Sequence, residues 1–164
     1  MPTPLVVILM GSKADVPHGQ KIAEAARNLG LESEQRVGSA HKTPGHVLDM
    51  LRRYAADQRP KVYITVAGRS NALSGLVDGA VTEPVIACPP PSEAYGAQDL
   101  WSSLRMPSGI APAVVLEPAN AALLAAKILA LADGALAQRV AEYQRGLAEK
   151  IRADDQALAT GGRP

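Results

Sequence analysis

Short runs of apolar residues alternate with longer mixed segments along most of the chain. The residues Leu5–Met10 are all apolar, several of them β-branched, and Gly11 ends the run. A continuous run of this kind is typical of a strand buried on both faces in a parallel sheet. Further strands are expected at residues 34–37, 61–66, 84–87 and 113–116, with helices at residues 15–29, 44–56, 72–79 and 120–131. Asp15 can cap the first helix, Gly30 can close it, and Pro44 suits the first turn of the second.

This alternation predicts an α/β fold in which helices cover both faces of a doubly wound parallel sheet. The three layers, α/β/α, resemble the flavodoxin-like arrangement. In such a sheet a ligand binds at the carboxyl ends of the strands, where the strand order reverses. Three segments with small and polar residues follow predicted strands, at residues 11–15, 39–44 and 68–74. We therefore expect these segments to meet at one pocket.

The chain from residue 134 onward has a different pattern. A helix predicted at residues 134–158 carries one apolar stripe with steps of three or four, formed by Leu136, Val140, Tyr143, Leu147 and Ile151. We therefore divide the chain into a main unit, residues 1–133, and a C-terminal helix with a frayed tail, residues 134–164. We expect this helix to pack on a neighbouring subunit. Packing on its own domain stays open, because amphipathicity alone does not choose between the two.

The composition is that of a globular chain. Of the 164 residues, 47% are hydrophobic and 20% are charged, which argues against intrinsic disorder. The formal net charge is +1 and aromatic residues make up 3% of the chain. A nucleic-acid binder usually has a basic surplus or aromatic rings for bases to stack on. We therefore expect no nucleic-acid partner.

The start of the chain gives no sign of export. Its Met-Pro-Thr-Pro lacks the basic start and apolar run of a signal peptide, and the single cysteine, Cys88, cannot form an internal disulfide. No apolar stretch approaches the ~20 residues needed to cross a bilayer. We expect a cytoplasmic protein without a membrane partner, with Cys88 as a small buried residue.

The first expected loop has residue types that suit an anion. It reads Met-Gly-Ser-Lys-Ala-Asp at residues 10–15. Gly11 allows close backbone approach, and Ser12 with the free N–H groups of a helix start can hold a phosphate. The loop lacks the further glycines of a dinucleotide fingerprint and the Gly-Lys-Ser/Thr of a P-loop, which disfavours nucleoside triphosphate hydrolysis. By itself a Gly-Ser pair more often marks an ordinary turn.

Three histidines are available for catalysis. With the one cysteine they show no zinc-ligand spacing, so no metal site is expected. Residues 68–72, Gly-Arg-Ser-Asn-Ala, are close to a hydrolase nucleophile elbow, but every histidine precedes Ser70 and that class needs its histidine afterwards. His18 and His46 are expected on solvated helix surfaces. His41 lies in a loop at a strand end and is the better candidate for a general base.

Five motifs together resemble the PurE family of purine biosynthesis, over residues 5–132. They are residues 10–15 (MGSKAD), 39–44 (SAHKTP), 67–73 (AGRSNAL), 98–109 (QDLWSSLRMPSG) and 120–126 (NAALLAA). The family has two classes. Class I is a mutase that moves a carboxylate from the exocyclic nitrogen to the ring carbon of aminoimidazole ribonucleotide (AIR), whereas class II adds free carbon dioxide to that carbon.

Within the family the chain resembles class II. Lys42 stands where class I typically has arginine, and Ala72 stands where class I has a second histidine. Residues 101–109 also resemble the class II form, which animals carry as one domain of a two-domain enzyme. One departure is Ala14, because the family commonly has serine before the aspartate. One side-chain contact to the phosphate would then be missing.

The resemblance implies a role for each matched position. The nucleotide and its 5′-phosphate would be held by Gly11, Ser12, Ser39, Lys42, Gly68, Ser70 and Asn71. Asp15 would accept hydrogen bonds from the ribose hydroxyls, a task that suits an acceptor-only carboxylate. Asn71, Ala72 and Leu73 would shape a small carbon dioxide pocket, and His41 would take the ring proton. The role of Arg69 stays open between ligand and neighbouring subunit.

The implied function is carboxylation of AIR by carbon dioxide to 4-carboxy-5-aminoimidazole ribonucleotide (CAIR) in purine biosynthesis. The reaction would be reversible and need neither ATP nor any cofactor, because the electron-rich ring carbon can attack carbon dioxide that is held close and dry. The alternatives are the class I mutase and a non-catalytic phosphoribosyl-nucleotide sensor on the same fold. The resemblance also implies a homo-oligomer, namely an octamer.

Overall fold

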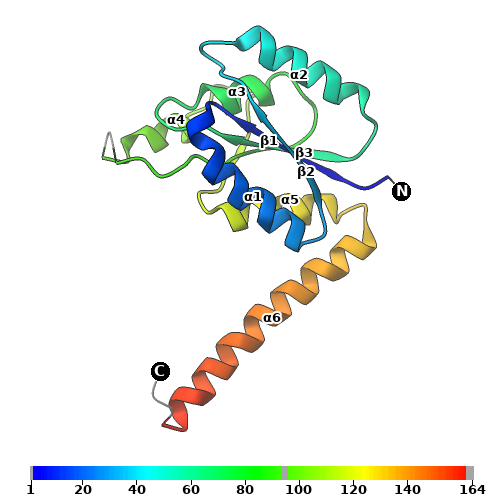
Figure 1. Cartoon of the computed structure of the whole chain (residues 1–164), viewed down its shortest axis with the longest axis vertical. Coiled ribbons are helices and arrows are strands. Elements are labelled where there is room, and N and C mark those ends of the chain that lie inside the picture. Colours follow the sequence, from blue (N-terminus) through cyan, green and yellow to red (C-terminus); the bar gives the residue numbers. More distant parts are fainter. Residues whose placement is uncertain (1, 94–95, 162–164) are drawn as a thin grey trace.

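The computed structural model describes residues 2–93 and 96–161 of the chain. In this part, five strands form one parallel sheet in the order β2-β1-β3-β4-β5, with helices on both faces (Figure 1). The strands are β1 Leu5–Met10, β2 Glu32–Val37, β3 Lys61–Val66, β4 Val85–Ala87 and β5 Ala113–Val114. The helices are η1 Lys13–Asp15, α1 Val16–Asn28, α2 Pro44–Ala56, α3 Ala72–Asp78, η2 Gln98–Leu100, α4 Trp101–Leu104, α5 Pro118–Leu129 and α6 Gly134–Ala159. The predicted α/β fold with a doubly wound parallel sheet is confirmed.

The central strand β1 supplies side chains to two separate hydrophobic cores. All six of its residues are buried, which explains the unbroken apolar run in the sequence. Val6, Ile8 and Met10 pack with α1, α5 and the start of α6. The alternate residues of β1 pack on the other face with α2 and α3. Because β1 lies beside β3, and α1 and α3 cover opposite faces, the chain leaves these two neighbouring strands in opposite directions and opens a crevice between them.

Several elements differ from the sequence prediction. β2 begins at Glu32 rather than at residue 34, because a polar edge strand has no apolar run to mark its start. β5 ends at Val114, earlier than the predicted residue 116. The short helices η2 and α4 were not predicted, because a few residues show no helical period.

The apolar stripe of α6 is covered over its first two turns and exposed beyond them. Leu136 and Val140 are buried in the core shared with α1 and α5. The exposed fractions of Tyr143, Leu147 and Ile151 then rise through 38%, 49% and 68%. Figure 1 shows the outer part of α6 leading away from the sheet and its helices. Residues 162–164 of the predicted frayed tail lie outside the described residues. None of the helices described is both long and apolar enough to cross a membrane.

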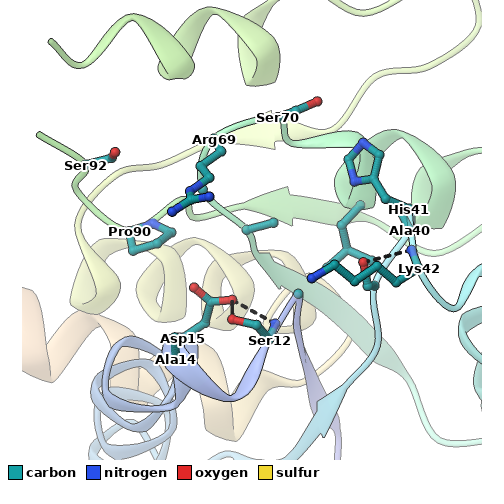
Figure 2. Close-up of a pocket in the computed structure, with 15 residues that line it drawn as sticks. Ser12, Ala14, Asp15, Ala40, His41, Lys42, Arg69, Ser70, Pro90 and Ser92 are labelled. Atoms are coloured by element: carbon teal, nitrogen blue, oxygen red, sulfur yellow. Dashed lines mark hydrogen bonds between the residues drawn. The ribbon is translucent and has the colours of Figure 1, made fainter. Parts of the chain in front are cut away.

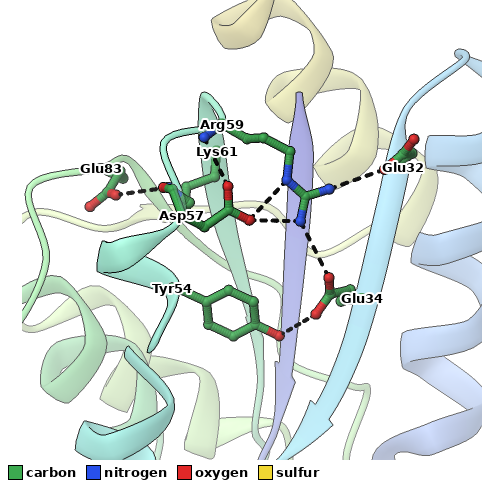
Figure 3. A network of polar contacts seen from close by, with 7 residues as sticks. All are labelled: Glu32, Glu34, Tyr54, Asp57, Arg59, Lys61 and Glu83. Carbon is green, nitrogen blue, oxygen red and sulfur yellow. Dashed lines mark hydrogen bonds and ion pairs between the residues drawn. The ribbon is translucent and has the colours of Figure 1, made fainter. Parts of the chain in front are cut away.

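A polar network joins β2 and the start of β3 to the segment before β4, at the opposite edge of the sheet from the crevice (Figure 3). Its members are Glu32, Glu34, Tyr54, Asp57, Arg59, Lys61 and Glu83. The Arg59 guanidinium lies 2.7 Å from a carboxylate oxygen of Asp57 and 3.1 Å from one of Glu32. The hydrogen bonds from Arg59 lower the pKa of Asp57 to about 2. Burial, and then the hydrogen bond that Tyr54 donates to Glu34, raise the pKa of Tyr54 to about 12. The network therefore stabilises the edge of the sheet that lies opposite the expected ligand site.

The end of α1 is closed by a Schellman turn that also anchors α6. The N–H of Leu31 donates to the carbonyl of Ala26, and the N–H of Gly30 donates to that of Arg27, with Gly30 at φ 76°. The Arg139 Nε of α6 donates to the Leu29 carbonyl at 3.2 Å. Gly30 is needed here because a Cβ atom would lie 2.7 Å from that Nε.

We expect Gly30→Ala to lower the free energy of unfolding by about 1–2 kcal/mol from the left-handed backbone alone, and by more if Arg139 is displaced. Chemical denaturation measures this change. Gly45→Ala is the matched control, because Gly45 lies in helix α2 with no atom within 4 Å of an added Cβ. Equal stability of the Gly30→Ala protein and the wild type would show that the turn does not depend on glycine.

Candidate active site

A cavity of about 530 Å³ lies at the carboxyl ends of β1, β2 and β3, where the strand order reverses (Figure 2). Its walls come from the three loops that the sequence singled out and from the segment after β4. The lining residues are Gly11, Ser12, Ala14, Asp15, Ser39, Ala40, His41, Lys42, Ala67, Gly68, Arg69, Ser70, Leu73, Pro90 and Ser92. The prediction that the three loops meet at one pocket is therefore confirmed.

The loop after β1 is tied to the sheet at its start. The Gly11 N–H donates to the Val66 carbonyl of β3 at 2.8 Å, which continues the ladder one residue beyond β1. The backbone N–H and the hydroxyl of Ser12 both donate to Oδ2 of Asp15, at 2.9 and 3.0 Å. Oδ1 of Asp15 takes part in neither bond. Asp15 therefore orients Ser12 and keeps one carboxylate oxygen for a further donor.

The loop after β2 closes on itself and presents two polar side chains. The Ser39 N–H donates to the Thr43 hydroxyl at 3.0 Å, and the Lys42 N–H donates to the Ser39 hydroxyl at 3.1 Å. The Thr43 N–H completes the ring by donating to the Ser39 carbonyl at 2.9 Å. His41 and Lys42 are exposed at the tip of this loop and line the cavity. Figure 2 shows Lys42, Asp15 and Arg69 arranged around the same space.

The loop after β3 has a left-handed residue, Arg69, at φ 60°. A non-glycine residue in this region is strained and needs support from its surroundings. The Arg69 N–H donates to the Asp99 carboxylate at 3.1 Å, and the Asn71 N–H donates to the Ser102 hydroxyl at 2.9 Å. The side-chain amide of Asn71 donates to the Ser103 hydroxyl at 2.8 Å. Hydrogen bonds from residues of η2 and α4 thus hold this loop in place.

Nearly all residues expected at the site line the cavity. The exceptions are Asn71 and Ala72. Asn71 is buried, and its side chain caps α3 by accepting from the Ser74 N–H at 3.3 Å. Ala72 is exposed as the first residue of α3. Leu73, expected beside them, does line the cavity.

Sequence reasoning missed two lining residues, Pro90 and Ser92. Both follow β4, which pairs with β3. Since parallel strands end at one edge, the segment after β4 reaches the same cavity, and the strand order is the signal that could have found it. Arg69, for which the sequence does not decide between a ligand and a neighbouring subunit, lines the cavity as well.

The prediction that His18 lies on a solvated helix surface was wrong. Its side chain is half-buried, with Nε2 3.4 Å from Sγ of Cys88. Burial lowers the pKa of His18, and the charge of Lys21 acts in the same direction. Burial also raises the pKa of Cys88 to about 12, so this thiol stays protonated. Cys88 is buried as predicted, and His46 is exposed as predicted.

The site offers hydrogen-bonding groups and charges rather than a metal cage. Within residues 2–93 and 96–161, no three His, Cys, Asp or Glu side chains are grouped so that they could hold a metal ion. The cavity has two cationic side chains, Lys42 and Arg69, one carboxylate, Asp15, and one imidazole, His41. Hydroxyl groups of Ser12, Ser39, Ser70 and Ser92 surround them. Such a set suits a small polar anion with hydroxyl groups.

A protein-family model described as AIR carboxylase matches residues 5–150. The chain belongs to the AIR carboxylase family. A phosphoribosylaminoimidazole carboxylase of Treponema denticola is 57% identical over 94% of this chain and 98% of its own length. An enzyme of the same name from Archaeoglobus fulgidus is 47% identical over 93% of this chain and 83% of its own length. The expected family, and with it the expectation of a carboxylase enzyme, is confirmed.

The fold is shared with a solved member of the AIR carboxylase family, and the domain also occurs within a longer protein. The crystal structure of Treponema denticola PurE superposes with a TM-score of 0.93 at 57% identity, covering 94% of this chain and 98% of that one. The human bifunctional phosphoribosylaminoimidazole carboxylase/phosphoribosylaminoimidazole succinocarboxamide synthetase is 46% identical over 78% of this chain, which corresponds to 30% of the human protein. The fold and the loops of the cavity therefore belong to a family of purine biosynthesis.

Proposed function

We propose that the chain carboxylates AIR with free carbon dioxide to give CAIR, as class II of the family does. One observation carries the proposal: His41, Lys42 and Asp15 line one cavity in a member of the AIR carboxylase family. Two residues favour class II, Lys42 in place of arginine and Ala72 in place of a second histidine. The relatives from Treponema denticola and Archaeoglobus fulgidus are named carboxylases, and so is the first activity of the human relative.

The cavity suits a phosphoribosyl nucleotide. We assign the 5′-phosphate to Ser12, Ser39, Lys42, Ser70 and the backbone of Gly68, whose donors complement phosphate oxygens. The free oxygen of Asp15 suits a ribose hydroxyl, and Gly11 allows the nucleotide to approach the backbone. Ser12 can turn its hydroxyl from Asp15 to the phosphate by rotation about one bond. Ala14 contributes no hydroxyl, so this phosphate has one donor fewer than in family members with serine there.

Leu73 suits a wall of the carbon dioxide pocket, because carbon dioxide is uncharged. An apolar leucine side chain also binds no water that would compete with carbon dioxide for this space. Asn71 and Ala72 precede Leu73 in the chain and do not line the cavity. We propose that Ala72 matters through its small side chain, because it stands at the start of α3 where class I has a second histidine. We assign Asn71 to fixing Leu73 and Ser70 on either side of it, through its bonds to Ser74 and Ser103.

The chemistry follows from the substrate. The aminoimidazole ring carbon attacks carbon dioxide, and the new carbon–carbon bond makes that ring carbon tetrahedral while it still bears its hydrogen. Aromaticity returns when this proton leaves, and neutral His41 takes it. Carbon dioxide supplies the carboxylate without ATP or a cofactor, because holding both reactants in place lowers the barrier. Protonated His41 returns the proton in the reverse direction, so the same site catalyses decarboxylation.

We also propose that the enzyme works in the cytoplasm as a homo-oligomer, an octamer as the family resemblance implies. The physical support is the exposed stripe Tyr143, Leu147 and Ile151 on the outer part of α6, which has no cover within the described chain. Fully burying a Leu or Ile side chain stabilises an assembly by about 1.5–3 kcal/mol before ordering costs. Residues 1–133 then form the catalytic domain, and residues beyond 140 join neighbouring subunits.

The first prediction is that AIR and bicarbonate give CAIR with the protein alone, without ATP. Absorbance of the carboxylated product follows the reaction, with a protein-free sample as the control. Turnover of only the N-carboxylated nucleotide would show a class I mutase instead. Nucleotide binding without turnover of either substrate would show a sensor.

We expect His41→Asn to keep nucleotide binding but to lower kcat by about 10²–10⁴-fold, the usual contribution of a positioned base. Steady-state kinetics in both directions and calorimetric binding of AIR separate the two effects. His46→Asn is the matched control, because His46 is exposed on α2 and is not among the residues that line the cavity. Unchanged turnover of His41→Asn would remove His41 from the mechanism.

For the assembly, we expect the double variant Leu147→Gln, Ile151→Gln to reduce the particle mass in light scattering, because both changes remove apolar surface that a neighbouring subunit would cover. Leu136 and Val140 stay in place, so the fold of the single chain is preserved. Glu149→Gln with Arg145→Gln tests for a general effect of substitution on this helix. A wild-type protein that scatters as a monomer at micromolar concentration would contradict the proposal.

A further inference from the structure

We propose that the short segment formed by η2 and α4 is a clamp that positions the loop after β3 for substrate binding. The clamp residues are Asp99, Ser102 and Ser103, and the clamped loop is residues 68–71. This inference rests on the proposed function, because the loop's task is taken to be binding of the nucleotide phosphate. It assigns a positioning role to side chains that do not line the proposed substrate cavity.

The loop needs such support because Arg69 has a left-handed backbone. This conformation is strained for a residue with a Cβ atom and persists where neighbouring groups hold it. The clamp provides a partner on each side of the strained residue. Oδ2 of Asp99 accepts from the Arg69 N–H at 3.1 Å, and the Ser102 hydroxyl lies 3.4 Å from the Arg69 carbonyl oxygen. The strain therefore coincides with the place where the clamp touches the loop.

The Ser102 hydroxyl is the centre of the clamp. It accepts from the Asn71 N–H at 2.9 Å, and its own proton is directed at the Asp99 carbonyl at 2.7 Å. One hydroxyl thus links the loop to the turn that carries the Asp99 carboxylate. Beside it, Ser103 is 1% exposed and accepts from the Asn71 amide at 2.8 Å. Loss of the Ser102 hydroxyl would leave the Asn71 N–H without its acceptor.

Polar contacts, rather than apolar packing, set the position of this segment. The only buried residue of α4 is Ser103, whereas Trp101 and Leu104 are 62% and 51% exposed. A segment with so little apolar burial takes its position from its hydrogen bonds. On the other side of the loop, Gly68, Arg69 and Ser70 form one wall of the substrate cavity. The backbone of residues 68–70 therefore separates the clamp from the cavity in which the substrate is proposed to bind.

This arrangement predicts how the clamp affects kinetics. The phosphate is bound equally in the ground state and in the transition state, since it does not react. A displaced loop therefore weakens both states alike, which raises the KM for AIR and leaves kcat nearly unchanged. A general loss of folding would instead lower the amount of active enzyme and hence kcat.

The test compares Ser102→Ala, Ser102→Thr and Asp99→Ala with the wild type in the carboxylation assay. We expect Ser102→Ala and Asp99→Ala to raise the KM for AIR by up to about tenfold, the effect of losing one hydrogen bond, with kcat within about threefold of wild type. Ser102→Thr keeps the hydroxyl and should restore the KM. Ser33→Ala, a half-buried serine on β2, is the matched control.

A double-mutant cycle with Ser70→Ala tests whether the clamp acts through the loop. We expect Ser102→Ala to change the KM less in the Ser70→Ala background than in the wild type, because residues that act through one another are not additive. Thermal unfolding of each variant shows whether the fold is intact.

Three results would overturn the clamp while the wild type remains active: an unchanged KM in Ser102→Ala, a fall in kcat without a change in KM, or full additivity with Ser70→Ala. A wild-type protein without carboxylation activity would instead contradict the proposed function. In that case, calorimetric binding of AIR to the same variants still tests the clamp. Equal affinities of the wild type and Ser102→Ala would overturn it there.

Discussion

The position of the site depends on one topological constraint, the adjacency of β1 and β3 in a parallel sheet. Helices α1 and α3 pack on opposite faces, because alternate residues of the strands feed two separate cores. The loops after β1 and β3 therefore lead to opposite faces of the sheet, which leaves a crevice between them. Its floor is fixed by the Gly11 N–H, which donates to the Val66 carbonyl and holds the two strands together at the point where they part.

Much of this frame could be predicted from the sequence, for reasons that are local. A strand buried on both faces is largely apolar in sequence: β1 is apolar throughout, and β3 is apolar or aromatic except at Lys61 and Thr65. The polar edge strand β2 and the two-residue β5 carry weaker signals, because pairing with a neighbour defines them more than their own residues do. The burial of His18 has a signal in the sequence, namely its spacing from apolar residues. His18 stands four residues before Ile22 and eight before Ala26, on the buried face of α1.

The candidate site was predictable in its loops but not in its supports. Small and polar residues after strand ends identify loops that meet, since parallel strands end at one edge. No comparable rule indicates that Asp99 would reach the backbone of Arg69, thirty residues away in sequence, or that Asn71 would turn from the cavity to Ser103. Such contacts depend on the path of an irregular segment after β4. Its short helices lack the length for a readable period.

The two ends of the sheet divide stability and binding between them. At the amino ends, charged groups satisfy one another, so that the Arg59 guanidinium meets the carboxylates of Asp57, Glu32 and Glu34. At the carboxyl ends, Lys42, Arg69 and His41 face a cavity, and Asp15 keeps one oxygen unused by Ser12. Polar groups that are not matched within the chain can be matched by a ligand, whereas a fully paired network gains little from one. The charged groups at the amino edge of the sheet are therefore paired with one another, whereas those at the carboxyl edge are available to a ligand. This difference explains why the same strands carry a stabilising network at one edge and a binding site at the other.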